Sequence, residues 1–475
     1  MNKANYLTRE LRNCSLLAPL SSDEYLPPAP CRDEAMAAEL LRRDAERAAR
    51  RLVLPLEHYL GSRMGTAAAL AAINAASGRD FYAVRRSLSE DREEAAQYFD
   101  RRELVIDVQT HFVADHRVDL PGAQGVHQFI RHVAPDIFRG LDTAIDLSFE
   151  EYLRCIFLQS ETSLAVLTAA PGSDDINILA NREIAGAREL VDRLAGSDRL
   201  LHHSIVHPNV EGELDNMARI VERHRPDGFK VYTLYGDPGG GGRGWRLDDP
   251  QCGLPFLARA RELGVGIICA HKGLSNLAPT GSPADVGPAA AAFPDLNFLI
   301  YHSGYEVPRR QGDGEILEGP FPEDTDSDAV LEGTDRLVAS LRDAGVGPGA
   351  NVYAELGSTW YLLARRPREA AHVLGKLLLA VGEDNILWGT DSVWYGSAQP
   401  LIDAFRAFEM PDEYRERFGY PALTPAVKRK ILGLNAARVY GVDPERALAA
   451  AQRDELGWLS RAVAEFRRFE RRTTG

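Results

Sequence analysis

From Leu104 onward, short apolar runs alternate with segments whose apolar residues recur at helical spacing. Eight runs stand out, and in chain order they are "LVIDVQTH", "CIFLQSETSLAVLTAAP", "LLHHSIVHPN", "GFKVYT", "GVGIICAHKG", "LNFLIYHSG", "NVYAELGS" and "NILWGTDS". Helical patterns such as "ELDNMARIVERHRP" and "GLPFLARARELG" lie between most of them. Eight strand–helix units over roughly 330 residues predict an α/β fold, a closed parallel (β/α)8 TIM barrel. A doubly wound open sheet is the alternative, but that fold usually has a GxGxxG fingerprint after an early strand, and none follows the first two runs here.

The two ends of the chain follow a different pattern. Residues 1–103 combine helix-forming residues with alternating charges, and "SLSEDREEAAQYFDRR" predicts a helix with Ser89 as its N-cap. Residues 442–475, with "PERALAAAQRDELGWLSRAVAEFRRFERR", predict an exposed helix that packs on the outside or on a partner subunit. We therefore expect a helical N-terminal extension over 1–103, the barrel over 104–441 and a C-terminal helix over 442–475.

Composition narrows the functional classes. A net charge of -14 argues against non-specific nucleic-acid binding, and no stretch approaches the roughly 20 apolar residues of a membrane span. The five cysteines form no close pair, so a disulfide framework is not expected. Arg50 and Arg51 precede an apolar run, Thr66–Ala76, that loosely resembles a twin-arginine signal; an alanine-rich helix packed closely on a neighbour is the favoured interpretation. We expect a cytoplasmic homo-oligomer that binds a small molecule, without nucleic-acid or membrane partners.

The chemistry-bearing residues fall at the C-terminal ends of the predicted strands. Nearly every run is apolar in its body and ends in a polar group; these groups are Gln109, His111, His207, Lys230, His271, His302, Glu355 and Asp391. In a parallel barrel all C-terminal strand ends open on one face, so these side chains are predicted to converge there. One histidine at a strand end is usually an ordinary satisfied side chain, but histidines, a lysine and carboxylates on one rim match a metal-ligand set.

The motifs "xTH", "GFKVYT", "ICAHKG", "FLIYHSG" and "ILWGTDSVWYG", in this order, carry a resemblance. Over residues 104–441 the chain resembles the metal-dependent amidohydrolase superfamily. The branch it resembles includes aminocarboxymuconate-semialdehyde decarboxylase and related benzoate-type decarboxylases.

The resemblance implies a ligand set for one or two divalent ions, with zinc, iron and manganese as the candidates. His111, His271 and Asp391 are implied ligands. In single-metal members the residue at His302 acts on substrate or polarises the nucleophilic water. In two-metal members His271 and His302 hold a second ion, and a carboxylated lysine at the position of Lys230 bridges the pair. An unmodified Lys230 that forms a salt bridge or binds a substrate carboxylate is equally open.

Gln109 stands where the family has a histidine. A glutamine oxygen is a weak neutral ligand that suits a hard ion better than zinc. Three roles for Gln109 are open: it coordinates the ion weakly, it forms a hydrogen bond to a water on the metal, or it leaves the site one ligand short. A protein that has lost its catalytic activity is a further alternative. Because His111, His271, His302 and Asp391 all persist, a functioning site is favoured.

The predicted function is a metal-dependent hydrolase in which activated water attacks an amide, ester or lactone-type carbonyl. Asp391 serves as ligand and proton shuttle, assisted by His302. Nonoxidative decarboxylation, a carbon–carbon lyase reaction, is the first alternative, and a non-catalytic barrel scaffold is the second. Aromatic residues after the strand ends predict a substrate that is small and aromatic or apolar. The candidate substrate contacts are Tyr232, Tyr305, Trp360 and Trp394.

Overall fold

The chain forms a parallel barrel in the computed structural model, as the sequence predicts. The structure describes residues 30–121, 147–234, 244–275, 278–307 and 332–473, together with Leu16, Leu17, Ser22 and Gln124. The strands are β1 (Ile106–Thr110), β2 (Leu164–Leu167), β3 (Leu200–Ile205), β4 (Gly228–Tyr232), β5 (Ile267–His271), β6 (Asn297–Tyr301), β7 (Val352–Glu355) and β8 (Ile386–Leu387). They pair in parallel in the order β1 to β8, which is chain order.

Backbone hydrogen bonds between the first and last strand regions close the barrel. The Val108 amide donates to the Trp388 carbonyl at 3.0 Å, and the Asp391 amide donates to the Gln109 carbonyl at 2.9 Å. The sequential strand order and this closure exclude the doubly wound alternative, whose strand order reverses at a switch point.

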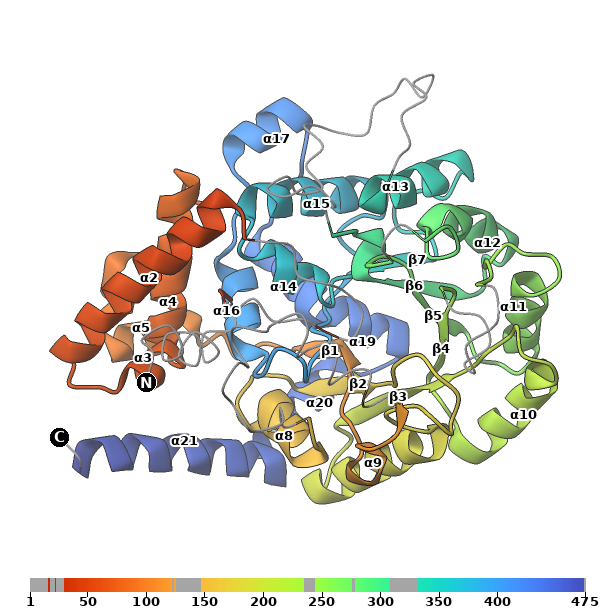
Figure 1. The fold of residues 1–475 in the computed structure, drawn as a ribbon, viewed down its shortest axis with the longest axis horizontal. Coiled ribbons are helices and arrows are strands. Elements are labelled where there is room, and N and C mark those ends of the chain that lie inside the picture. The colour runs from red at the N-terminus through yellow and green to blue at the C-terminus, as the bar shows by residue number, and fades with distance from the viewer. Residues whose placement is uncertain are drawn as a thin grey trace.

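Helices surround the strands on the outside (Figure 1). They are α8 (Phe149–Leu153), α9 (Asn181–Ala195), α10 (Glu213–His224), α11 (Gly253–Glu262), α12 (Val286–Ala292), α13 (Gly333–Asp343), α14 (Thr359–Leu363), α15 (Pro367–Ala380), α16 (Gln399–Ala407), α17 (Asp412–Phe418), α18 (Pro425–Arg429) and α19 (Asn435–Tyr440). Inside the barrel, apolar side chains such as Ile106, Leu164 and Leu299 pack together with Ala436 and Ala437 of α19. Side chains therefore fill the barrel, and chemistry is confined to its ends.

The second predicted strand is much shorter than its apolar run. Only Leu164–Leu167 is a strand, while Arg154–Leu158 continues α8 as a π-helical turn. The prediction was wrong for "CIFL" because a short continuous apolar run fits a buried helix and a buried strand equally well.

The predicted N-cap at Ser89 was also wrong. Ser89 ends a 3₁₀ turn, Arg86–Ser89, and the following helix α5 (Arg92–Phe99) is capped by Asp91. The Asp91 carboxylate accepts hydrogen bonds from the backbone amides of Glu93 and Glu94, each at 2.9 Å. A carboxylate satisfies two of the unpaired amides of the first helical turn, so the helix begins there.

The C-terminal region forms two helices, α20 (Pro444–Arg453) and α21 (Glu455–Thr473), where the sequence predicted one. Asp454 separates them. Its carboxylate accepts the Gly457 amide at 2.8 Å, which caps α21, and pairs with Arg199 at 2.9 Å. Because both partners of that ion pair are almost fully buried, the chain bends at Asp454 instead of continuing one helix.

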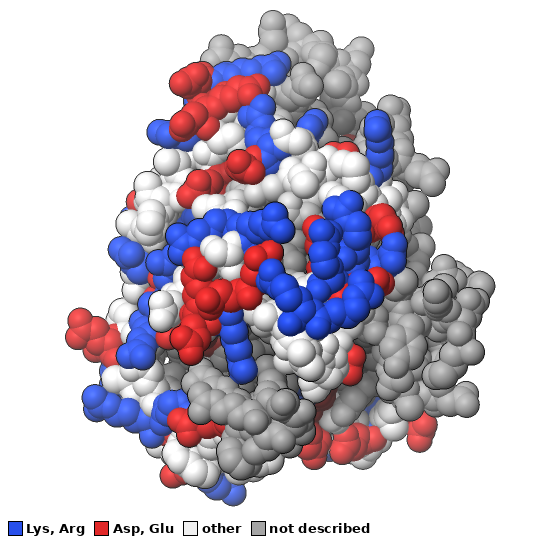
Figure 2. Space-filling view, turned by 90° about the vertical axis from the view of Figure 1, so that its left-hand side faces the viewer, with Lys and Arg blue, Asp and Glu red and all other residues white. Residues whose placement is uncertain are grey.

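The N-terminal region is helical, with α2 (Arg32–Arg51), α3 (Leu56–Leu60), α4 (Arg63–Ser77) and α5. The alanine-rich helix predicted within Thr66–Ala76 is α4, whose side chains are mostly buried. A Cβ at Gly65 would collide with the carbonyl oxygens of Tyr59 and Leu60, so glycine permits this close approach. Acidic and basic side chains are interspersed over this face of the molecule (Figure 2).

The described residues contain no helix long and apolar enough to cross a membrane. The described cysteines, Cys31, Cys155, Cys252 and Cys269, are free thiols. Cys14 lies outside the described residues.

His372 of α15 makes the free energy of unfolding depend on pH. Burial, reinforced by Lys376 and Arg417, lowers its pKa to about 4 from 6.5. Between these values the unfolded chain binds a proton that the folded chain does not, so stability falls as the pH falls from 6.5 toward 4. We expect a loss of at most about 1.4 kcal/mol for each pH unit from this side chain. In urea unfolding at about pH 7 and pH 5, His372→Gln should therefore lose less stability than the natural chain; equal losses would contradict this assignment.

Candidate functional site

Five buried side chains lie at the C-terminal mouth of the barrel, in two contacting groups. Gln109 belongs to β1 and His111 follows it, His271 ends β5, His302 follows β6, and Asp391 lies beyond β8. We call these five residues the rim cluster. All are at most 2% exposed. The rings of His271 and His302 are 4.8 Å apart, edge to face.

Asp391 is the most connected member of the rim cluster. Its Oδ1 lies 3.1 Å from His111 Nε2 and accepts hydrogen bonds from the Gln109 side-chain amide at 3.1 Å and from the Trp394 indole at 3.3 Å. Its Oδ2 accepts a hydrogen bond from the Ser358 hydroxyl. Gln109 and His111, two residues apart, both turn toward this carboxylate.

Backbone carbonyls orient two of the histidines. His111 Nδ1 lies 3.0 Å from the Thr168 carbonyl, and His302 Nδ1 lies 2.7 Å from the Gly357 carbonyl. A carbonyl only accepts, so each Nδ1 carries a hydrogen, and in the neutral ring Nε2 carries the lone pair. This second-sphere hydrogen bond is the usual means of fixing a metal-binding imidazole.

The backbone at the mouth adopts a conformation that favours glycine. Asp391 has φ 59°, His302 has φ 66°, Ser303 has φ 53° and Ser358 has φ 53°. These are four of the eight non-glycine residues with positive φ in the described part of the chain. Each costs about 1–3 kcal/mol, and such residues cluster at active sites, where the surrounding structure holds them.

Glu355, the last residue of β7, supports this strained backbone. Its carboxylate accepts the His302 amide at 3.1 Å and the Gly357 amide at 2.5 Å. Burial raises the pKa of Glu355 to about 8; the His302 side chain and these amides oppose the shift, and Asp391 adds to it. A Cβ at Gly357 would collide with carboxylate and amide oxygens of Glu355 and Gln109, so only glycine fits between them.

Gln109 leaves one atom available to a ligand. Its amide nitrogen donates to Asp391, while its Oε1 is buried and has no hydrogen-bond partner among the described residues. A buried amide oxygen without a partner costs about 1–3 kcal/mol, and a cation or a water molecule would remove that cost.

The rim cluster is not a complete metal site made of charged and imidazole groups. Within the described residues, no three His, Cys, Asp or Glu side chains lie together as metal coordination requires. His111 and Asp391 form one adjacent pair, and His271 and His302 form another. A third protein ligand for the first pair would therefore be the neutral oxygen of Gln109.

Lys230 lies on the inside of β4, below the mouth. Its ammonium is 3.7 Å from the ring centre of Tyr301 and 4.6 Å from that of Tyr232. The faces of aromatic rings attract a cation and disfavour an anion. This environment suits an ammonium better than the carbamate that would bridge two ions.

The four candidate substrate contacts divide into two pairs. Trp394 stacks on His111 with ring centres 5.7 Å apart, and the ring centres of Tyr232 and His271 are 5.1 Å apart. Trp360 instead donates to the Leu401 carbonyl of α16, and Tyr305 donates to Glu369 of α15 at 2.6 Å. The structure thus brings Trp394 and Tyr232 to the rim cluster, whereas Trp360 and Tyr305 are engaged with the outer helices.

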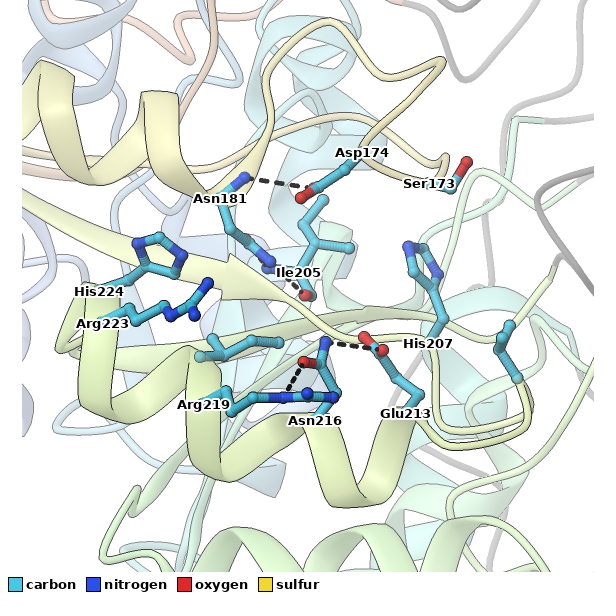
Figure 3. Close-up of a pocket in the computed structure, with 12 residues that line it drawn as sticks. Ser173, Asp174, Asn181, Ile205, His207, Glu213, Asn216, Arg219, Arg223 and His224 are labelled. Carbon is cyan, nitrogen blue, oxygen red and sulfur yellow. Dashed lines mark hydrogen bonds between the residues drawn. The ribbon is translucent and has the colours of Figure 1, made fainter.

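His207, expected at the mouth from its place after the third strand, lines a different pocket (Figure 3). This pocket of about 320 Å³ lies along α10 and is polar, with Glu213, Arg219 and His224 among its lining residues. It shares no described residue with the rim cluster. His207 Nε2 is 3.0 Å from the Gly172 carbonyl, so a backbone contact accounts for its position.

Sequence reasoning missed the part played by Ser358. Ser358 joins the Asp391 carboxylate to the hydroxyl of Tyr395, which is 2.5 Å from the serine oxygen. The run "NVYAELGS" ends in this serine, so a polar group at the strand end is visible in the sequence. Serine is not a typical metal ligand, so the residue type alone does not single it out.

The sequence model of the family described as Amidohydrolase matches residues 106–442, well over half of the chain. Among curated proteins, none matches the chain.

Solved structures similar to this one have low sequence identity. 5-Carboxyvanillate decarboxylase from Sphingomonas paucimobilis is 14% identical, with 72% of this chain and 99% of that chain covered and a TM-score of 0.41. Dihydroxybenzoic acid decarboxylase from Polaromonas, with bound manganese and the inhibitor 2-nitroresorcinol, is 16% identical, with 71% of this chain and 97% of that chain covered and a TM-score of 0.39. A protein from Pseudomonas putida provisionally described as 2-pyrone-4,6-dicarboxylic acid hydrolase is 18% identical, with 71% of this chain and 97% of that chain covered and a TM-score of 0.38. Likeness at this level says nothing about which reaction this chain catalyses.

The position of Lys230 leads to a test of its chemical state. Because its amine lies on two ring faces, we expect it to remain an ammonium when the protein is incubated with bicarbonate. Carbon-13 NMR of protein in labelled bicarbonate should show no carbamate signal that disappears in Lys230→Met. A carbamate signal that this substitution removes would show that Lys230 is carboxylated.

Proposed function

Because the chain belongs to the amidohydrolase family, we propose that it is a metal-dependent hydrolase of a small, aromatic or apolar substrate. In this proposal the metal site is the rim cluster, and the scissile bond is an amide, ester or lactone-type acyl bond. The homo-oligomer expected from the sequence stays a prediction.

The observation that carries the proposal is the approach of His111 Nε2 to Asp391 Oδ1 at 3.1 Å. The hydrogen bond from His111 Nδ1 to Thr168 places a hydrogen on Nδ1, so in the neutral ring Nε2 directs a lone pair at an oxygen that also has only lone pairs. Such a contact is repulsive unless a proton or a cation lies between the two atoms. Two ligands about 2.0–2.2 Å from one ion are themselves roughly 3 Å apart, so the spacing fits a shared divalent ion.

The remaining ligands supplement this pair. Gln109 Oε1 is a buried acceptor without a partner among the described residues, and its amide could turn so that the oxygen faces the same ion. His271 and His302, which lie beside each other, would complete the first site or hold a second ion. A divalent ion held here supplies Lewis acidity, which acidifies water and polarises a carbonyl.

The protein's own groups would handle the protons. Asp391 has one oxygen beside His111 and the other hydrogen-bonded to Ser358, so it is placed to take a proton from water and deliver it to the leaving group. The hydrogen bond from His302 Nδ1 to Gly357 holds that ring in the tautomer whose Nε2 can accept a proton or a metal ion. Trp394, stacked on His111, offers an aromatic face next to the reacting carbonyl.

Decarboxylation is the second candidate, and the position of Lys230 favours it. A buried ammonium below the mouth, between Tyr232 and Tyr301, could bind a substrate carboxylate and align it for loss of carbon dioxide. The same rim cluster would serve this reaction, so only the products separate it from hydrolysis.

The proposal is tested by measuring products with and without metal. Chain reconstituted with Mn²⁺ or Zn²⁺ should release acid together with amine or alcohol from a panel of aromatic amides, esters and lactones, and should lose this activity on chelation. Asp391→Asn should reduce kcat/KM by at least about 100-fold, because it removes both a ligand charge and the proton acceptor. Asp343→Asn, an exposed aspartate of α13, is the matched control and should retain full activity.

Other outcomes decide between the alternatives. Release of carbon dioxide from aromatic acids, with no hydrolysis, would assign the chain to the decarboxylases. A protein that binds no metal and turns over none of these substrates, yet is equally stable, would support a non-catalytic scaffold.

Gln109 sets the expected metal preference. Its neutral oxygen suits a hard ion, whereas an imidazole nitrogen suits zinc. We expect Gln109→His to raise the affinity for Zn²⁺ by about 10-fold or more while leaving that for Mn²⁺ nearly unchanged. Competition titrations with a chromophoric chelator measure both constants. An unchanged ratio of the two affinities would mean that Gln109 does not contact the metal.

A further inference from the structure

Glu34, in the first turn of α2, is buried against the barrel, unlike other acidic residues of its helix. Glu39 and Glu46 form ion pairs with Arg42 on the exposed side of α2. Glu34 is only 8% exposed, and its two carboxylate oxygens pair with Arg365 at 3.3 Å and Arg366 at 3.2 Å. Figure 1 shows α2 at the side of the barrel, beside α4, and both arginines follow α14 directly in the chain.

Burial and the neighbouring groups have opposite effects on the pKa of Glu34. Burial acts to raise the pKa of Glu34, yet the two guanidinium groups and the Cys31 amide together outweigh it, so the net shift is downward. Arg365 and Arg366 are themselves at most 9% exposed in their side chains. Buried arginines that lose their carboxylate must find water or another partner. Arg366 has a second carboxylate partner, Glu369, at 3.6 Å, so Glu34 bears mainly on the position of Arg365.

Arg365 in turn contacts a pair of stacked tyrosines. Its guanidinium lies 4.8 Å from the ring centre of Tyr361. Tyr361 stacks on Tyr395 with ring centres 3.8 Å apart and planes within 14°. Both rings are 1% exposed. The Arg365 guanidinium thus lies against the ring of Tyr361, which itself stacks on Tyr395, so contacts run from the guanidinium to both rings.

The inner ring of this stack reaches the rim cluster. The hydroxyl of Tyr395 is 2.5 Å from Ser358 Oγ, and Ser358 donates to Asp391 Oδ2. Ser358, Tyr361 and Arg365 lie three and four residues apart, which places them on one face of the helical turn around α14. That helix has five residues, too few to be stable without anchoring at its ends.

On the premise of the proposed metal site, we infer that Glu34 is a positioning residue for Asp391. It acts through Arg365, Tyr361, Tyr395 and Ser358. The N-terminal helix, which lies outside the residues matched by the family model, is then part of the machinery that orients a metal ligand. It holds the turn that begins at Ser358, whose positive φ needs surrounding contacts to persist.

The test measures metal affinity, so it needs no known substrate. The full-length apo protein is titrated with Mn²⁺, and free ion is followed by electron paramagnetic resonance, for the natural chain, Glu34→Gln and Glu39→Gln. We expect Glu34→Gln to raise the dissociation constant by about 3–10-fold, less than the 10–100-fold of a direct partner of a ligand. Glu39→Gln removes the same charge from the exposed side of the same helix and should leave the constant within about twofold, because exposed pairs contribute little.

A second variant separates positioning from general destabilisation. Tyr395→Phe removes the hydroxyl next to Ser358 while retaining the stacked ring, and should weaken Mn²⁺ binding by about 10-fold. Glu34→Gln in the Tyr395→Phe background should then produce no further loss, since the path is already interrupted. If Glu34→Gln does not fold, Arg365→Lys tests the same link, because it keeps the charge and removes the planar stack.

Each outcome has one meaning. Losses that multiply in the double variant, or a Glu34→Gln chain with a lower melting temperature and natural Mn²⁺ affinity, would overturn the inference and leave Glu34 a purely structural residue. If the natural chain binds no Mn²⁺ or Zn²⁺, the proposed metal site fails first. That result is distinct from failure of the Glu34 path.

Discussion

A buried carboxylate at the mouth of the barrel is the constraint on which the rest of the site depends. Asp391 has no exposed surface, so its charge must be balanced by the groups around it. The hydrogen bonds from Gln109, Trp394 and Ser358 only partly meet this need, and the neighbouring His111 adds a lone pair or a proton. The proposed divalent cation, shared by His111 and Asp391, would complete the balance.

Holding these side chains together requires an unfavourable backbone conformation. Asp391, His302 and Ser358 all have positive φ, and each lies within a few residues of the end of a strand. Glu355 receives the amides of His302 and Gly357 and so fixes this backbone. Strain of this kind persists only where dense packing over-determines it, which explains why glycines and buried tyrosines surround the mouth.

The segments outside the family match share in that packing. Through Glu34, the first turn of α2 neutralises two buried arginines, and the stack of Arg365 on Tyr361 and Tyr395 extends from that contact to Ser358. At the other end, Asp454 breaks the chain into α20 and α21 by pairing with Arg199. The ion pairs of Glu34 with Arg365 and of Asp454 with Arg199 join residues hundreds of positions apart, so no local sequence pattern predicts them.

The sequence by itself determined the barrel, because alternating strand and helix periods recur eight times and leave little choice of topology. It also determined that Gln109, His111, His271, His302 and Asp391 share one end, since parallel strands finish on the same face. Only the tertiary structure decided which atoms meet: His111 with Asp391, Trp394 at the mouth, and Trp360 and Tyr305 on the outer helices. Side-chain direction beyond a strand end depends on backbone turns and packing partners distant in sequence, and periodicity carries no information about either.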